Sequence, residues 1–179
     1  LAARPESVRC LLVSPAGYPN AGVQKLMDAC RALHVPVEEA PRAVERISGK
    51  QNAWTVTVLN KYDCALDPAA NHVVLHNPSD VGNVGTILRS ALGFGFENVA
   101  VIRPSVDPFD PRVLRASMGA AFHLQLKQYD CFEDYLKDCG QREFYLFRLR
   151  NAQKLQDQGT TARTPFSLVF GNEASGLPK

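Results

Sequence analysis

The sequence predicts an α/β protein built on a parallel sheet. Two apolar runs, residues 73–75 and 99–102, are separated by a helical repeat and are typical of neighbouring strands. Two strands joined through one helix form a parallel βαβ unit, because antiparallel neighbours need only a short turn. The 179 residues, 45% of them hydrophobic and 21% charged, indicate a soluble globular chain of one domain, or of a small and a medium domain.

The first part of the chain predicts a small α/β module over residues 1–62. Apolar runs and alternation indicate strands, and apolar residues at helical spacing indicate a helix after Asn20. Pro41 suits the first turn of a second helix, which runs to Ile47 and which Gly49 closes. The strands are expected at 8–14, 35–37 and 55–59. A module of this size folds alone only marginally.

A turn-rich connector, residues 63–70 with Asp67-Pro68, predicts the domain boundary, and residues 71–179 form the second domain. After the central βαβ unit, helices are expected at 111–117 and 131–139, and strands at 123–127, 144–149 and 167–170.

The helix of the central unit is predicted from five apolar residues that share one face: Val84, Ile87, Leu88, Ala91 and Leu92. Gly93 and Gly95 then end it. The loop before such a helix lies at the carboxyl edge of the sheet, where ligands bind in open α/β folds. Asn83 and Arg89 are therefore expected on this loop and the first turns, facing that edge.

Several kinds of function are disfavoured. There is no G-x-x-x-x-G-K-[ST] motif, and the one G-x-G comes at a helix end. The four histidines lack metal-ligand spacing, so no metal site is expected. The five scattered cysteines predict reduced thiols in a cytoplasmic protein. Without a signal peptide or a long apolar segment, neither secretion nor membrane insertion is expected. The net charge of +2 permits a polyanionic partner without requiring one.

Two polar stretches are candidates for the site. Residues 77–89 follow one apolar strand, and the sequence GNEASGLP at 171–178 follows another. Taken singly, the first can be a capped helix with a solvated arginine and the second a glycine turn. Because both follow strands of a parallel sheet, they are expected at the same edge. Gly171 and Gly176 would let the backbone approach a flat ligand closely.

These stretches resemble the SpoU-type, or TrmH-like, branch of the SPOUT superfamily of knotted RNA methyltransferases. NVGTILRSALGFGFENVAVI is similar to the family's first motif, with an Asn six residues before an Arg, and FSLVFGNEASGLP to its second. The run VLRASMGAAFHL between them also matches. The resemblance covers residues 71–179, and residues 1–62 resemble the small RNA-binding module, akin to a ribosomal protein, that often precedes this domain.

The resemblance implies transfer of a methyl group from S-adenosylmethionine to a ribose 2′-hydroxyl in structured RNA. Ribosomal RNA is the first choice of substrate and transfer RNA the second. In this family, the cofactor lies in a deep trefoil knot and is contacted mainly by backbone groups. The matched positions are Gly171, Asn172, Gly176 and Leu177, with Val169 and Phe170 as neighbours and Leu149 as a weaker match after the preceding strand.

The resemblance also gives Arg89 the central catalytic role. A guanidinium resists deprotonation, so holding a phosphate and stabilising developing charge is favoured over acting as a general base. Asn83 would position Arg89 or the RNA backbone, and Glu173 would pin the helix or Arg89 itself. Arg112 and Arg115, three residues apart, are either phosphate contacts or a solvated helix face.

Two further expectations follow from the family. A homodimer is expected, with the first-motif helix at the interface. A family member also continues into a third motif and a final helix, which nothing after Lys179 supplies, so a shortened chain with an incomplete knot and an open cofactor pocket is expected. The rival interpretations are a methyltransferase-like RNA-binding protein without activity and, from another class, a small-molecule nucleotide-binding domain.

Overall fold

A computed structural model describes residues 3–49, 52–148 and 165–178. The chain divides into two compact units, Leu1–Tyr62 and Asp63–Lys179. The segment 63–70, expected to be a linker, is bonded to the second unit: the Cys64 amide donates to the Leu126 carbonyl at 3.0 Å, and the Asp67 amide donates to Asn98 Oδ1 at 2.9 Å. In the described part of the chain, no helix has the length and apolar character needed to cross a bilayer.

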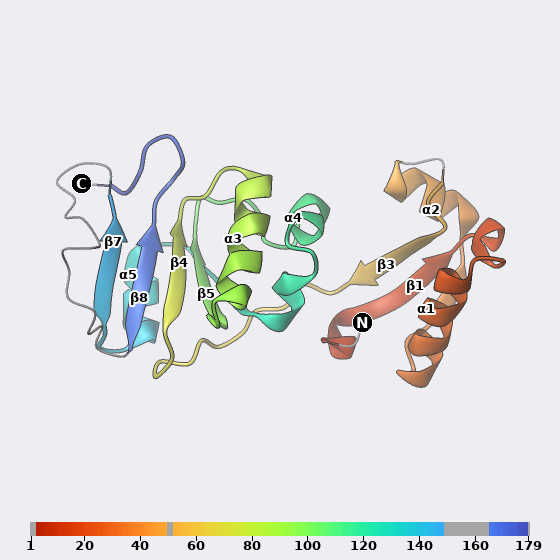
Figure 1. Cartoon of the computed structure of the whole chain (residues 1–179), viewed down its shortest axis with the longest axis horizontal. Coiled ribbons are helices and arrows are strands. Elements are labelled where there is room, and N and C mark those ends of the chain that lie inside the picture. Colours follow the sequence, from red (N-terminus) through yellow and green to blue (C-terminus); the bar gives the residue numbers. More distant parts are fainter. Residues whose placement is uncertain (1–2, 50–51, 149–164, 179) are drawn as a thin grey trace. The chain divides into compact units, whose positions relative to one another are not determined.

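The first unit is a three-stranded sheet with two helices (Figure 1). Its strand order is β2-β1-β3, with β2 parallel and β3 antiparallel to β1. Asn20 caps α1 by accepting from the amides of Gly22 and Val23, and Gly49 ends α2 in the left-handed conformation. The elements are β1 (Val8–Val13), α1 (Ala21–Ala32), β2 (Val37–Glu39), α2 (Pro41–Ser48) and β3 (Thr55–Leu59), with short 3-10 turns at Pro5–Ser7 and Pro15–Gly17.

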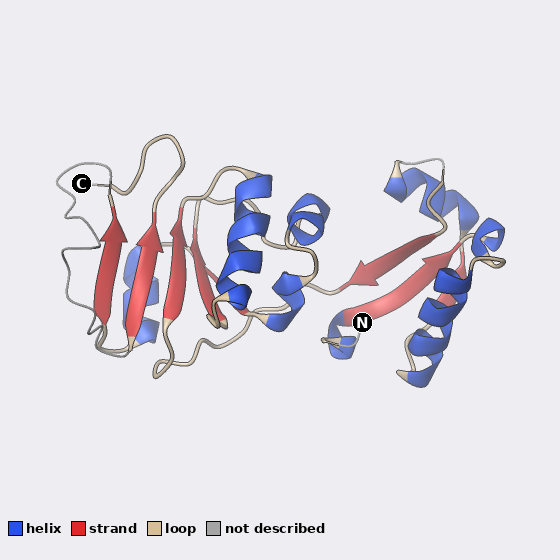
Figure 2. Ribbon diagram, in the orientation of Figure 1, coloured by secondary structure: helices blue, strands red, loops and turns tan. Residues whose placement is uncertain are grey.

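The second unit is a five-stranded sheet in which every neighbouring pair is parallel, as predicted (Figure 2). The strand order is β6-β5-β4-β8-β7. After β4, the chain adds β5 and β6 on one side of it and then crosses to add β7 and β8 on the other side. The elements are β4 (His72–His76), α3 (Val81–Gly93), β5 (Asn98–Ile102), α4 (Pro111–Ala116), a 3-10 turn (Ala120–His123), β6 (Gln125–Tyr129), α5 (Phe132–Cys139), β7 (Glu143–Phe147) and β8 (Phe166–Phe170). The reversal of strand order beside β4 is the place where open α/β sheets bind ligands.

Helices cover both faces of this sheet, α3 on one and α5 on the other (Figure 1). On the α5 face, Tyr135 and Cys139 pack against Val74 and Val169. On the other side, α3 packs closely against α4 at Gly85, where an added Cβ would lie 2.4 Å from Ala116 Cβ. Only glycine permits that approach.

Three predicted strands differ from the observed ones by two residues at one end or both. The strand expected at 35–37 is Val37–Glu39. The strand expected at 123–127 is Gln125–Tyr129, because Ala120–His123 forms a 3-10 turn. The strand expected at 144–149 is Glu143–Phe147, and Leu149 lies outside the described residues. The predicted knot depends on segments outside the described residues and stays a prediction.

Buried polar side chains form a bonded network at the amino edge of the sheet. His72 and Ser167, the buried first residue of β4 and second residue of β8, meet at the Tyr135 hydroxyl of α5. Tyr135 Oη lies 3.0 Å from His72 Nδ1 and 2.7 Å from Ser167 Oγ, and His72 Nε2 lies 2.8 Å from the Asp67 carbonyl. Arg142 Nη1 donates to Ser167 Oγ at 3.2 Å.

One arrangement of protons satisfies every member of this network. Burial lowers the pKa of His72 to about 4, although its bond to the Asp67 backbone opposes the shift, so the ring is neutral near pH 7. Its Nε2–H then donates to the Asp67 carbonyl, and Nδ1 accepts from Tyr135. Tyr135 in turn accepts from Ser167, which accepts from Arg142. The network is therefore complete without a ligand.

Candidate active site

The two candidate stretches meet at the carboxyl edge of the sheet, where the Glu173 carboxylate joins them. Glu173 Oε2 accepts from the Ser79 hydroxyl at 2.7 Å and from the Ser79 amide at 3.1 Å, and Oε1 accepts from the Asp80 amide at 3.3 Å. Partial burial raises the pKa of Glu173, but the hydrogen bonds outweigh it and lower the pKa to about 2. Glu173 therefore holds the start of α3 and not Arg89, the other partner expected for it.

Asn172 shapes the terminal loop with its side chain. Its Nδ2 donates to the Asn77 carbonyl at 2.9 Å and to Ser79 Oγ at 3.1 Å. Its Oδ1 accepts from the amides of Ala174 and Ser175 at 2.9 and 3.0 Å. Because these bonds use both ends of the amide, the Asn172 side chain organises the loop. Its expected contact with a cofactor stays a prediction.

Gly171 and Gly176 allow the loop to close on itself. The amides and carbonyls of Asn172 and Gly176 bond reciprocally at 3.1 and 2.9 Å. A Cβ at Gly171 would lie 2.3 Å from the carbonyl carbon of Gly176, and Gly176 itself has a φ of +72°. Both glycines are thus required by the loop's own shape.

A cavity of about 160 Å³ lies on the α3 side of this edge. It is lined by Leu75 and Phe170 of the sheet, by Asn83, Thr86 and Ile87 of α3, and by Pro78, Gly171 and Glu173. The side chain of Asn83 is exposed and makes no hydrogen bond among the described residues. This cavity is smaller than the usual range for a small-molecule site.

A larger cavity, of about 310 Å³, lies at the same edge beside α5. Its apolar wall includes Ile102, Phe132, Val169 and Leu177, and its polar lining includes His76. The volume is at the lower end of the range for small-molecule sites. It is therefore the better candidate for a cofactor site.

The two cavities lie on opposite faces of the sheet, because successive residues of a strand point to opposite sides. Val169 faces α5 and the larger cavity, whereas Phe170 lines the smaller one. The terminal loop contributes Leu177 to the first and Glu173 to the second. The residues expected around one cofactor are thus divided between two cavities.

Arg89 lies apart from both cavities. It is an exposed residue within α3, six positions after Asn83, which corresponds to about 9 Å along the helix axis and roughly 120° around it. The expectation that Arg89 lies in the first turns is wrong, because six residues span almost two turns. No hydrogen bond or ion pair engages its side chain among the described residues. The guanidinium is therefore available to a partner.

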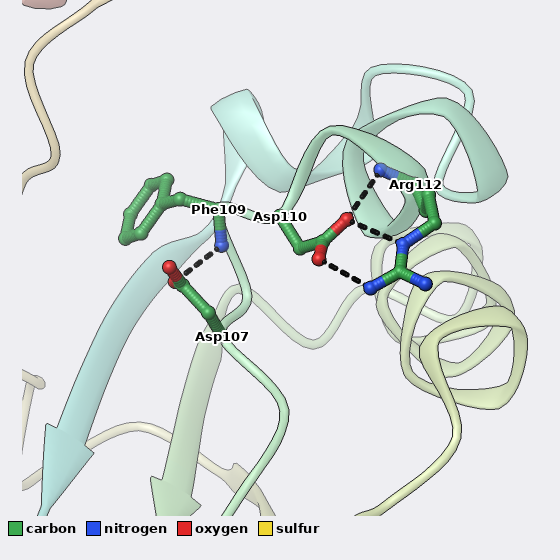
Figure 3. A network of polar contacts seen from close by, with 4 residues as sticks. All are labelled: Asp107, Phe109, Asp110 and Arg112. Atoms are coloured by element: carbon green, nitrogen blue, oxygen red, sulfur yellow. Dashed lines mark hydrogen bonds and ion pairs between the residues drawn. The ribbon is translucent and has the colours of Figure 1, made fainter.

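The two arginines of α4 differ in their partners. Asp110 caps this helix, and its carboxylate accepts from the Arg112 amide at 2.7 Å and from Arg112 Nε and Nη2 at 3.1 and 2.8 Å (Figure 3). The guanidinium contact is the main reason that the pKa of Asp110 falls to about 2. Arg115 is exposed, without a side-chain hydrogen bond or ion pair in the described part of the chain. Of the two predicted phosphate contacts, Arg115 is the one not already engaged.

His76 is a polar cavity residue that the sequence did not single out, since its histidines were considered only as metal ligands. It is the last residue of β4, and its ring meets Phe132 edge to face at 6.4 Å between centroids. The available signal was a polar residue at the carboxyl end of an otherwise apolar strand.

The parallel sheet, with its reversal beside β4 and two loops joined across its carboxyl edge, is the fold of the SPOUT class of methyltransferases. The structure superimposes with a TM-score of 0.75 on the AdoMet-bound rRNA methyltransferase from Sinorhizobium meliloti, at 21% sequence identity over 96% of this chain and 66% of that one. The chain belongs to the SpoU rRNA Methylase family, whose sequence model matches residues 70–179.

Two relatives share this region at the sequence level. The mitochondrial rRNA methyltransferase 3 of Xenopus tropicalis is 32% identical over 113 residues, which cover 56% of this chain and 27% of that protein. The 23S rRNA (guanosine(2553)-2′-O)-methyltransferase of Bacillus subtilis is 30% identical over 100 residues, covering 55% of this chain and 39% of that protein. The chain thus spans well under half of either relative.

Proposed function

We propose that this protein methylates ribose 2′-hydroxyls of ribosomal RNA, with S-adenosylmethionine as methyl donor. The observation that carries the proposal is the junction at the carboxyl edge, where Glu173 and Asn172 join the two family motifs and Leu177 of the same loop lines a cavity of about 310 Å³. The Bacillus subtilis relative is named as a 2′-O-methyltransferase of rRNA, which supports the choice of atom and substrate.

The larger cavity fits the cofactor better than the smaller one. It combines an apolar wall at Ile102, Val169 and Leu177 with the imidazole of His76, a suitable lining for a nucleoside. When bound, S-adenosylmethionine supplies the methyl group. Leu177 and Val169, which line this cavity, would hold it, and Asn172 and Gly176 would contact it through the backbone of the terminal loop. Gly171, which lines the other cavity, would shape that loop. Phe170 faces the other cavity and would support the loop.

The exposed polar residues of α3 and α4 would hold the RNA so that a ribose reaches the carboxyl edge, where the cofactor cavity also lies. A ribose hydroxyl is a weak nucleophile, so the site must orient it and stabilise the charge that develops as its proton leaves. Arg89, exposed and unengaged in the described part of the chain, would hold the neighbouring phosphate and stabilise that charge. Asn83 would position the RNA backbone, and Arg115 would contact a more distant phosphate.

The first unit would add RNA affinity. Residues 1–62 carry eight Lys or Arg and five Asp or Glu, whereas residues 63–179 carry twelve and thirteen. The net positive charge of the chain therefore lies in the unit that resembles an RNA-binding module, because the charges of the second unit nearly cancel. The compartment is a separate prediction: the thiols favour a reducing one such as the cytoplasm, and the Xenopus relative is named as mitochondrial.

The proposal is tested by radiolabelled methyl transfer into ribosomal RNA, followed by nuclease digestion to identify 2′-O-methyl nucleosides. Arg89→Ala is expected to lower the rate at least about a hundredfold, the usual effect of removing one charge-stabilising donor, while cofactor binding and folding stay unchanged. Lys137→Ala, which removes an exposed α5 lysine paired with Asp134, is the control and keeps the parent rate. Parent-level transfer by Arg89→Ala would remove Arg89 from the mechanism, and RNA binding without transfer by the parent would favour an inactive RNA-binding protein.

A homodimer is also proposed, through the side of the second unit that carries α3 and α4. Phe94, directly after α3, is 83% exposed, and Met118, just after α4, is 77% exposed. In such a dimer, the partner would cover these two large apolar side chains. Sedimentation equilibrium is expected to give a dimer, weakened by Phe94→Ser but not by Leu33→Ser in the first unit. A monomer at high concentration would contradict it.

A further inference from the structure

An exposed ion pair lies at one end of the larger cavity. Arg103 directly follows β5, Asp130 directly follows β6, and both residues line the cavity. The last residues of these strands, Ile102 and Tyr129, are partners in the parallel register, so the residues after them lie side by side. Arg103 Nη1 contacts Asp130 Oδ1 at 2.6 Å, and the Arg103 amide donates to the Tyr129 carbonyl at 2.9 Å. The sheet therefore fixes where this pair of opposite charges lies.

Each member of the pair keeps unused hydrogen-bonding capacity. The side chains of Arg103 and Asp130 are 53% and 79% exposed, and among the described residues their mutual contact is the only side-chain bond of either. A guanidinium carries several N–H donors and a carboxylate several acceptor positions, so one contact leaves most of both free. An exposed pair of this kind adds little to stability. Both charges are therefore accessible to a ligand in the cavity.

The rest of the lining shows that the cavity has two chemically different ends. It extends across the sheet from Asp130, beside the edge strand β6, to Leu146 on the opposite edge strand β7. At about 4.8 Å from strand to strand, these edges are roughly 19 Å apart. Leu146 and Val169 make the β7 end apolar, with Arg148 as its charged residue, whereas Arg103 and Asp130 give the β6 end both signs of charge. An elongated ligand with an apolar ring system at one end and a zwitterion at the other fits this lining.

We propose that Arg103 and Asp130 bind the amino-acid end of the cofactor. The α-carboxylate of S-adenosylmethionine accepts from the Arg103 guanidinium, and the α-ammonium donates to the Asp130 carboxylate. The pair itself stays intact, because the zwitterion completes a ring of alternating charges. The inference rests on the proposed function, since it orients the cofactor within the proposed cavity. The nucleoside then lies at the β7 end and the sulfonium near the middle strand, β4, whose following loop leads to α3.

The first test measures the affinities of two probes by calorimetry. S-adenosylhomocysteine has the amino-acid end, and 5′-methylthioadenosine keeps the nucleoside and sulfur but lacks that end. The parent is expected to bind 5′-methylthioadenosine about tenfold more weakly. Arg103→Met is expected to lose about fivefold in affinity for S-adenosylhomocysteine and less than about twofold for 5′-methylthioadenosine, because only the first probe presents a carboxylate. Lys137→Met, which removes a cation from another exposed ion pair, is the control and keeps both parent affinities.

The second test separates the two charges of the zwitterion. Asp130→Asn is expected to weaken S-adenosylhomocysteine about fivefold but not its analogue without the α-amino group, and Arg103→Met is expected to spare the analogue without the α-carboxylate. Unchanged affinity of Arg103→Met for S-adenosylhomocysteine, or an equal loss for both probes of the first test, would overturn this inference and leave the proposed function standing. Loss of the difference between those probes in Arg148→Met instead would put the amino-acid end at β7 and also overturn it. Failure of the parent to bind either probe would overturn the proposed cofactor site and this inference with it.

Discussion

At the amino edge of the five-stranded sheet, the buried side chains of His72, Tyr135 and Ser167 bond to one another, and Arg142 completes the chain. At the carboxyl edge, the polar atoms divide into two groups. Asn172 and Glu173 are used to shape and hold loops, whereas His76 Nδ1 and the exposed Asn83 side chain have no hydrogen bond among the described residues. A complete network stabilises the fold, whereas the carboxyl edge keeps polar groups that no hydrogen bond of the described residues uses.

The largest effect is expected from Tyr135→Phe, which breaks the amino edge. The change removes the hydroxyl that donates to His72 Nδ1 and that accepts a hydrogen bond from Ser167. The free energy of unfolding should therefore fall by about 4 kcal/mol. Urea denaturation measures it. Tyr145→Phe is the matched control, because among the described residues the Tyr145 hydroxyl bonds only to the partly exposed Glu143, and its loss should change stability by less than about 1 kcal/mol. Equal losses in the two variants would refute the difference between the edges.

A pH titration tests the same edge without mutation. The pKa of His72 is about 4 in the folded chain against an ordinary 6.5, so below 6.5 the unfolded chain binds the extra proton first. The stabilisation is complete above pH 6.5 and is lost as the pH falls towards 4, by about 3 kcal/mol at most. Thermal unfolding across this range measures it. His72→Gln, which does not titrate, should lose the slope, and a slope that persists in this variant would assign it to other groups.

The smallest effect is expected at the carboxyl edge, from Glu173→Gln. The amide cannot accept all the hydrogen bonds that the carboxylate receives from Ser79 and Asp80, so the terminal loop is held less firmly. Affinity for S-adenosylhomocysteine should fall about tenfold, while unfolding changes by about 1 kcal/mol or less. Calorimetry measures the affinity, and urea denaturation measures the free energy of unfolding. A loss of stability as large as that of Tyr135→Phe would show that both edges serve the fold alike.

The sequence predicts the elements of the second unit well, because each depends on neighbours in the chain. The helical stripe at Val84, Leu88 and Ala91 is buried in α3 as predicted, and α5 ends at Gly140. The strand expected from residue 123 begins two residues later, since the pattern of apolar residues cannot distinguish a 3-10 turn from a strand start.

The site was predicted only in part. That residues 77–89 and 171–178 share an edge follows from parallel topology, and the structure joins them through Glu173. The division into two cavities was missed, because it depends on which face each residue of β8 takes. The network of His72, Tyr135 and Ser167 was also missed, since its members are 63 and 32 residues apart and no periodicity relates polar side chains over such distances.

The terminal loop is a common wall of two compartments, with Leu177 on one side and Glu173 on the other. Gly171 approaches the Gly176 backbone so closely that the loop has no slack to deform on one side alone. A ligand that displaces the loop from within one cavity therefore reshapes the other. We therefore expect the two occupancies to share a coupling free energy, which linkage requires to be reciprocal. If a bound cofactor changes the affinity of the α3-side cavity for its ligand by some factor, that ligand changes the affinity for the cofactor by the same factor.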